Sequence, residues 1–251
     1  MRTRRNGHSG AQPERLIGAT ALALAASIVI QNVVVVWAGA PGYGDPMADV
    51  LAFHADHQLA VAIAVGLEAL NLPLLLGFLV GLQGLIGRRG AGGADWSRLA
   101  VAAGAVLAAV WAVYAVLWNG VVLAADGLAE PGPELQLAWQ LHAGAFAWAL
   151  PALGTTLIGA ALAAHASALT PPWQRALALA GGGLLLVAGV FNLAIADGSA
   201  VLFVGMPGYL AWIVWLGATG VRLVRARGAD RPADAVTQAP ADWTSARHPH
   251  P

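Results

Sequence analysis

Apolar residues along this chain gather in six long runs, and short polar segments separate them. Each run has enough residues for a helix to cross the hydrocarbon core of a bilayer, which takes about 20. The runs lie at residues 16–40, 58–87, 99–125, 135–169, 176–196 and 199–221. This pattern predicts an all-α fold: a polytopic membrane domain over residues 16–224, built as a bundle of six transmembrane helices.

The remaining segments are polar and lack apolar periodicity. Residues 1–15 and 225–251 are predicted to be tails, and the second is rich in Ala, Pro and Asp, a composition typical of disorder. Between the first two runs, several prolines and glycines interrupt any continuous helix, and a short surface helix is predicted over 47–57.

The first run has a second interpretation, as a signal peptide. Basic residues precede it, and Ala38-Gly39-Ala40 resembles a small-residue cleavage site. The apolar part exceeds the roughly 7 to 15 residues of a signal core, which favours a retained helix. Cleavage would leave five spans and would not change the side on which each remaining loop lies.

The composition agrees with a membrane protein and excludes several classes of function. Hydrophobic residues make up 58% of the chain, charged residues 10%, and mean hydropathy is +0.67. The 13 basic residues balance 13 acids, so nothing favours nucleic-acid binding, and the partner that the composition predicts is the lipid bilayer. Cysteine is absent from the sequence, which excludes disulfides, thiolate metal sites and cysteine nucleophiles.

The arginines are sorted by segment, and this predicts an orientation. All lie in the N-terminal tail, in 88–98, at Arg175 or in the C-terminal tail, whereas the other three connections contain none. Because cytoplasmic loops are enriched in positive residues, both termini are predicted to be cytoplasmic. The arginine-only, alanine-rich composition is typical of a GC-rich bacterial genome, so we expect a bacterial plasma membrane.

A few polar side chains fall inside the apolar runs, where each needs a partner or a cavity. At 1.5 Å per residue, most of them lie roughly 5–10 Å below the outer boundary and Glu68 about 15 Å below it. Glu68 is the only acid deep within an apolar run. The candidate ligand- or proton-binding residues are Glu68, Asn71, Asn32, Asn119, Gln140, His142 and Asn192.

These positions predict an outward-facing polar pocket with Glu68 at its floor, which would bind or transport a small polar ligand, a cation or a proton. Asn71 shares the face of Glu68, and Ala64 and Leu75 continue that face at helical spacing. The alternative is structural: the amides cross-link helices, Glu68 is protonated, and the protein is an accessory subunit without a small-molecule site. A homodimer or another membrane partner also stays open.

Aromatic residues form two stripes that either pack in the core or line a pocket. Trp111, Tyr114 and Trp118 share one face of the third run. Tyr209 and the two tryptophans after it are placed in the inner half of the sixth run.

A zinc-type metal site is the alternative chemistry. His54 and His57 are three residues apart beside Asp56, and His142 begins the fourth run on the same side, so these histidines could converge on an ion in a metal-dependent membrane enzyme. Glu68 lies about 16 Å along a helix from His57 and is too far away to share that ion. No other catalytic motif or cofactor signature is present in the sequence, so enzyme activity stays open and is not favoured.

Several motifs together resemble a known family. They are the IQN ending of the first run, the GxP-containing loop, the LxLP of the second run, the WQLHAGAFAW entry to the fourth, and the pattern of the last two runs. The chain resembles, over most of residues 15–224, an uncharacterised family of six-span bacterial integral membrane proteins of the domain-of-unknown-function kind. The resemblance implies six spans and carries no catalytic residues or activity.

Overall fold

The computed structural model describes residues 11–125 and 132–225, and within them the chain is all-α without a strand. Six helices are long and apolar enough to cross a membrane, which confirms the predicted six-helix bundle and makes this a multi-pass membrane protein. They are α1 (Ala11–Trp37), α3 (Gln58–Arg89), α4 (Ala94–Ala125), α5 (Pro133–Ala166), α6 (Pro172–Val190) and α8 (Leu202–Arg225). The short elements are α2 (Met47–Asp56), η1 (Ala91–Gly93) and α7 (Asn192–Ala196).

Several predicted boundaries differ from the structure by a few residues. α1 begins at Ala11, inside the predicted tail of residues 1–15. α6 begins at Pro172, earlier than predicted, because a proline in the first turn of a helix leaves no backbone N–H unsatisfied. α6 also ends at Val190, and the rest of the predicted fifth span forms α7. The surface helix predicted over 47–57 is α2, whereas the predicted disordered tail lies, from residue 226 onward, outside the described residues.

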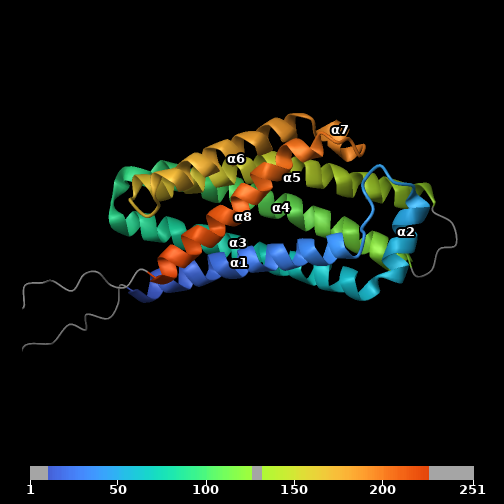
Figure 1. The fold of residues 1–251 in the computed structure, drawn as a ribbon, viewed down its shortest axis with the longest axis horizontal. Helices are drawn as coiled ribbons and strands as arrows, with labels where there is room; N and C mark the ends of the chain where they lie inside the picture. The colour runs from blue at the N-terminus through green and yellow to red at the C-terminus, as the bar shows by residue number, and fades with distance from the viewer. Residues whose placement is uncertain (1–10, 126–131, 226–251) are drawn as a thin grey trace, which may run out of the picture.

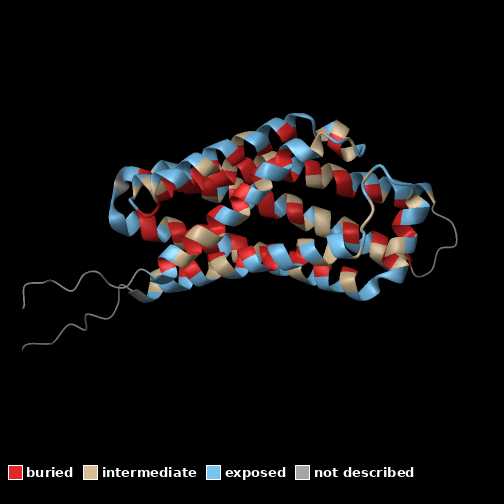
Figure 2. Ribbon diagram, in the orientation of Figure 1, coloured by how far each residue is buried: buried red, intermediate tan, exposed pale blue. Residues whose placement is uncertain are grey.

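The six long helices run side by side along the bundle, as Figure 1 shows, and their contacts close into a ring. Each packs on two others, in the order α1, α3, α4, α5, α6 and α8, and α8 returns to α1. Buried residues face the interior of the ring and exposed residues face outward, as Figure 2 shows. Because the outward faces of all six helices are largely apolar, lipid is the medium that suits them.

The two ends of the bundle carry opposite charges, and we name them by these charges. The arginine end holds every described arginine: Arg15, Arg88, Arg89, Arg98, Arg175, Arg222 and Arg225. The acidic end holds α2, α7 and the carboxylates of Asp45, Asp49, Asp56, Glu134 and Asp197.

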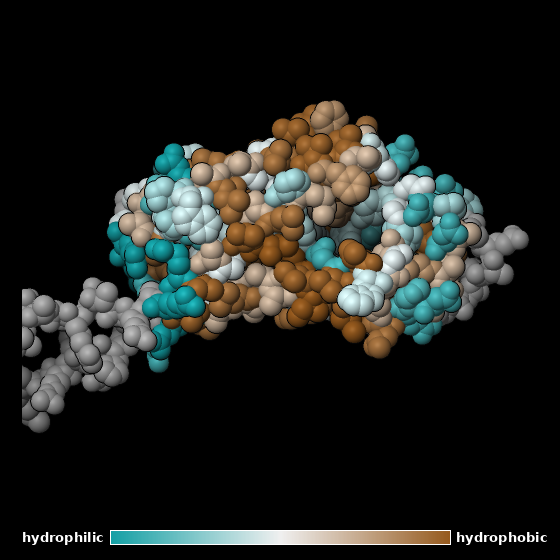
Figure 3. Space-filling model, viewed as in Figure 1, coloured by the Kyte–Doolittle hydropathy of each residue, from teal (hydrophilic) through white to brown (hydrophobic). Residues whose placement is uncertain are grey.

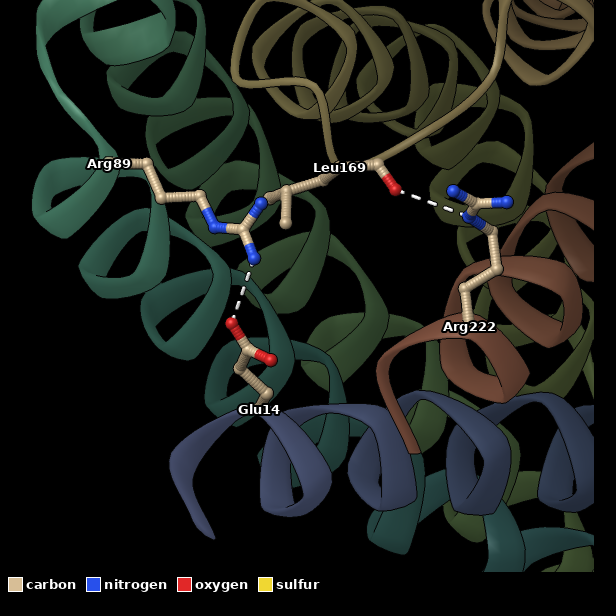
Figure 4. A network of polar contacts seen from close by, with 4 residues as sticks. All are labelled: Glu14, Arg89, Leu169 and Arg222. Carbon is tan, nitrogen blue, oxygen red and sulfur yellow. Dashed lines mark hydrogen bonds and ion pairs between the residues drawn. The ribbon is translucent and has the colours of Figure 1, made fainter. Parts of the chain in front are cut away.

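Polar contacts tie the arginine end together, as Figure 4 shows. Arg89 at the end of α3 forms a 2.9 Å ion pair with Glu14 on α1. Arg222 on α8 donates from Nε to the Leu169 carbonyl at 3.3 Å, in the loop before α6. The first contact joins α1 to α3, and the second joins α8 to the loop between α5 and α6.

Close packing fills the ring near the arginine end. A Cβ placed on Gly18 of α1 would lie 2.8 Å from the Gly220 carbonyl oxygen of α8, so only glycine permits this approach. Phe78, Trp212 and Trp215 are fully buried in the interior at this level. The space that remains inside the ring therefore lies toward the acidic end.

Candidate functional site

An inner cavity of about 150 Å³ lies inside the ring, and five helices line it. α3 contributes Glu68 and Asn71, which share a buried stripe with Ala64 and Leu75, as the helical spacing predicted. The remaining lining residues are Ile28, Gln31, Asn32 and Val35 of α1, Trp111, Tyr114 and Trp118 of α4, Phe146 and Leu150 of α5, and Gly205, Met206 and Tyr209 of α8.

Gln31 holds both polar residues of α3. Its Nε2 donates to Glu68 Oε2, and its Oε1 accepts a 2.8 Å hydrogen bond from Asn71 Nδ2. This orientation of the amide follows from the carboxylate, because an ionised carboxylate only accepts hydrogen bonds. Gln31 therefore positions Glu68 and Asn71 relative to one another and joins α1 to α3. Gln31 lies within the first predicted span but was not among the candidate binding residues.

Two buried acceptors at this cavity have no hydrogen-bond partner among the described residues: Glu68 Oε1 and Asn71 Oδ1. Glu68 is only 4% exposed and Asn71 1%. An acceptor left unsatisfied in a protein interior costs about 1–3 kcal/mol. The pair thus suits a group that donates hydrogen bonds, such as a proton on the carboxyl group, an ammonium ion or a hydroxyl.

Asn32 and Tyr209 form a second polar pair on the cavity wall. Asn32 Nδ2 lies 2.9 Å from the Tyr209 hydroxyl and 2.8 Å from the Ile28 carbonyl oxygen. Since the amide nitrogen donates, the Tyr209 oxygen accepts and keeps its own proton available. The sequence had placed Tyr209 in the inner half of the sixth span, and the structure corrects this. Tyr209 lies four residues after Gly205, so the two share the face of α8 that lines the cavity.

A larger outer chamber of about 530 Å³ adjoins the inner cavity on the side of the acidic end. Val35, Tyr114 and Trp118 line both spaces. The outer chamber is otherwise bounded by the end of α1, residues 39–43, α2, α5 and residues 195–203. Figure 3 shows a hollow on the viewed face near this end, with apolar surface toward the middle of the bundle and more polar surface toward the acidic end.

His142 is held among aromatic rings in the outer chamber. It stacks on Tyr114 with centroids 4.0 Å apart and on Trp139 with centroids 4.9 Å apart. Its Nδ1 donates to the Tyr114 carbonyl at 3.0 Å, which leaves Nε2 as the acceptor of the neutral ring. His142 therefore lies beside the chamber above Glu68, as a candidate residue should.

His54 has both ring nitrogens engaged. Nε2 accepts a 2.9 Å hydrogen bond from the Trp118 indole N–H, which only donates, and Nδ1 donates to the Val50 carbonyl at 2.6 Å. These bonds fix the neutral tautomer that is protonated on Nδ1. Burial lowers the pKa of His54 below its ordinary value, and the Val50 carbonyl partly offsets this effect.

The structure does not assemble the predicted metal site at His54, His57 and His142. α2 ends at Asp56, and His57, the cap residue after it, is exposed and stacks on Phe53, whereas His54 is buried. His54 has no free ring nitrogen to bind a metal. Within the described ranges, no group of three His, Asp or Glu side chains is placed to hold a metal ion.

Three other candidate residues do not reach the cavity. Asn119 and Gln140 are exposed, and each directly follows an inward-facing tryptophan. One further residue turns a helical side chain by about 100°, so these amides point away from the ring interior. Asn192 is the first residue of α7 and donates to the Gly189 carbonyl at 3.1 Å, across the break between α6 and α7. The prediction grouped these residues with Glu68 because they lie at a similar depth in the membrane. The direction of each side chain separates them from Glu68.

The segment over the acidic end of the chamber is held by close contacts. Tyr43 packs on Trp139, His142 and Phe146 with ring centroids 5.4 to 5.7 Å apart. Burial raises the pKa of the Tyr43 hydroxyl well above its ordinary value, and a hydrogen bond with Tyr114 partly offsets this, so the hydroxyl stays protonated. Gly198, with φ of +84°, lies against Gly44.

Comparison with known proteins adds no relative: no family model matches the chain, and no curated protein or solved structure does. What the site can do must therefore come from its own chemistry. That chemistry consists of two acceptors without partners at the floor, a tyrosine hydroxyl on the wall, and an aromatic chamber above them.

Proposed function

We propose that this protein binds a small hydrogen-bond-donating ligand, a cation or a proton in the inner cavity around Glu68. The observation that carries the proposal is the pair of buried acceptors, Glu68 Oε1 and Asn71 Oδ1, which face a cavity without a partner among the described residues. A carboxylate in a medium of low dielectric needs a compensating positive group or must take up a proton. An ammonium group or a proton supplies that compensation.

The hydrogen bonds of Gln31 favour this proposal over a purely structural role. A network that only cross-linked helices would use the acceptors of its members on one another. Gln31 occupies one oxygen of Glu68 and the amide nitrogen of Asn71, and it leaves the second oxygen of Glu68 and the amide oxygen of Asn71 without a partner in the described chain. The remaining capacity points to a ligand.

We also propose an orientation of the protein in the membrane. With the arginine end in the cytoplasm, as the distribution of arginines favours, the cavity lies in the outer half of a bacterial plasma membrane. Both termini are then cytoplasmic. The resemblance noted in the sequence implies six spans, and we propose membership of that uncharacterised six-span bacterial family.

The test compares Glu68→Gln with Glu134→Gln in purified protein reconstituted in liposomes. Glu134 is an exposed acid at the acidic end, so its variant controls for the loss of one negative charge. Methylammonium binding is measured by calorimetry, and proton uptake is measured with a pH-sensitive dye. We expect Glu68→Gln to abolish the saturable signal and Glu134→Gln to retain it. Equal signals from both variants and the unaltered protein would disprove the proposal.

A further inference from the structure

The inner cavity and the outer chamber form one compartment with two kinds of wall. Val35, Tyr114 and Trp118 line both spaces, so the two spaces share a wall at these side chains. The floor carries the acceptors of Glu68 and Asn71, whereas the outer part is lined mainly by aromatic and aliphatic side chains. A molecule that fills the whole compartment therefore has a polar end and an apolar body.

The compartment is bounded on one side by α1 and α8, which are in contact from the arginine end as far as Asn32 and Tyr209. Gly18 and Gly220 bring the two helices into contact there, and the bond from Asn32 to Tyr209 joins them farther along. Past that bond, residues of both helices line the two spaces: Val35 and Val36 on α1, and Leu202, Phe203 and Met206 on α8. Figure 3 shows the hollow on this face.

The edge of this opening is apolar and faces lipid. Val36 is 76% exposed and Phe203 70% exposed, and both line the outer chamber. An opening used from water would have a polar rim, because exposed apolar surface is unfavourable there. In a bilayer the same side chains contact acyl chains without cost.

The side toward the acidic end is covered. Tyr43 packs against Trp139 and Phe146, and the segment that carries it touches the turn at Gly198, where a Cβ would lie within 2.5 Å of Gly44. A route from the membrane is therefore more direct than a route from water.

Glu68 and Asn71 at the floor of the inner cavity determine which polar group of a ligand can bind there. Two acceptors, one of them a carboxylate, favour a cationic amine, which carries three N–H donors, and disfavour a carboxylate or phosphate by charge repulsion. An inner space of about 150 Å³ has the size of an engineered cavity that holds one benzene molecule, so the head is small. The outer chamber has room for a single alkyl chain.

We infer that the ligand of the Glu68 cavity is a single-chain amphiphile with a primary amine head, and that it enters from the bilayer between α1 and α8. This inference rests on the proposed function and gives it a ligand class and an entry route. The amine lies at Glu68 and Asn71, and the chain passes Val35 into the outer chamber.

The test measures binding of dodecylamine, dodecanoate and methylammonium to the detergent-solubilised full chain by native mass spectrometry. We expect one dodecylamine per chain, at least tenfold tighter than methylammonium, with no competition from dodecanoate. Glu68→Gln should lose the bound amine, and Glu134→Gln should keep it. Equal affinity for both amines would leave the proposed function standing and overturn the amphiphile, whereas binding of neither would overturn both. Equal binding of dodecanoate would overturn the amine head.

The route is tested with two matched tryptophan substitutions on α1. Val35→Trp fills the passage between the two spaces, whereas Val33→Trp is on the lipid-facing side, 52% exposed and outside both linings. We expect Val35→Trp to weaken dodecylamine binding at least tenfold and Val33→Trp to leave it unchanged. The chain path is wrong if the two variants bind dodecylamine equally, provided that both retain the melting temperature of the parent.

Discussion

Gln31 on α1 contacts Glu68 on α3 through its amide nitrogen, and the same amide accepts a hydrogen bond from Asn71 one turn farther along α3. One side chain thus decides how two buried polar groups of a neighbouring helix are placed. Removing it should have consequences both for the stability of the bundle and for the geometry of the cavity.

Gln31→Leu should destabilise the protein by about 2–4 kcal/mol. The leucine fills similar space but leaves Glu68 Oε2 and Asn71 Nδ2 without partners, and each buried group of this kind costs about 1–3 kcal/mol. Unfolding in a mixed-micelle denaturant titration measures the change. Gln140→Leu, at an exposed glutamine on α5, is the control and should change stability by less than about 0.5 kcal/mol.

Glu68→Gln should raise the stability of the protein without ligand by about 1 kcal/mol, although it removes binding. The new amide can accept from Gln31 with its oxygen and present its nitrogen to the free oxygen of Asn71, so one donor replaces one surplus acceptor. The melting temperature of purified protein, compared with that of Glu134→Gln, measures the gain. A lower melting temperature for Glu68→Gln alone would show that the acid makes a stabilising contact of its own.

The position of Glu68 on an inward stripe could be predicted from spacing, because a helix repeats its face every three or four residues and Ala64, Asn71 and Leu75 follow that rule. Run length and hydropathy were likewise enough for six spans. Spacing and run length do not show in which direction a side chain points relative to the neighbouring helices. Asn119 and Gln140 lie at the right depth and on the wrong side, and only packing reveals this.

Pairs between distant helices could not be read from the sequence. The contacts from Trp118 to His54 and from Asn32 to Tyr209 depend on which helices become neighbours, and the closed ring order is a property of side-chain packing. The predicted metal site was wrong in its geometry for the same kind of reason, since the spacing of His54 and His57 assumed a helix that in fact ends at Asp56.

The lowered pKa of His54 predicts that stability depends on pH. A histidine that is buried in its neutral form binds protons more readily when the chain unfolds, so its contribution is complete above the unfolded pKa of about 6.5 and is lost as pH falls below it. Melting temperature should therefore fall between pH 7 and pH 5. His54→Gln should flatten this part of the profile, and His57→Gln, at an exposed position, should leave it as it is.

Substitutions at Gly39 and Gly198, two glycines with positive φ, distinguish the cost of backbone strain from the cost of close contact at the acidic end. Gly39 has φ of +75°, and no atom lies within 4 Å of the Cβ that Gly39→Ala would add. The variant should therefore lose only the stability that an alanine loses in a left-handed conformation, about 1–2 kcal/mol. Gly198→Ala has φ of +84° and would also place its Cβ within 2.5 Å of the Gly44 backbone. It should therefore be the more destabilising of the two in denaturant titration, because the segment that carries Tyr43 must move away.

The same pair of variants tests how the outer chamber is covered. If the contact between Gly44 and Gly198 closes the side toward the acidic end, Gly198→Ala should expose that chamber to water while Gly39→Ala leaves it closed. The chain has no cysteine, so Val35→Cys can be added to each variant as a single reporter, labelled with a charged, membrane-impermeant thiol reagent. We expect faster labelling in the Gly198→Ala background only. Equal labelling rates in the two backgrounds would mean that the cover does not depend on this contact and that the chamber opens to water by another path.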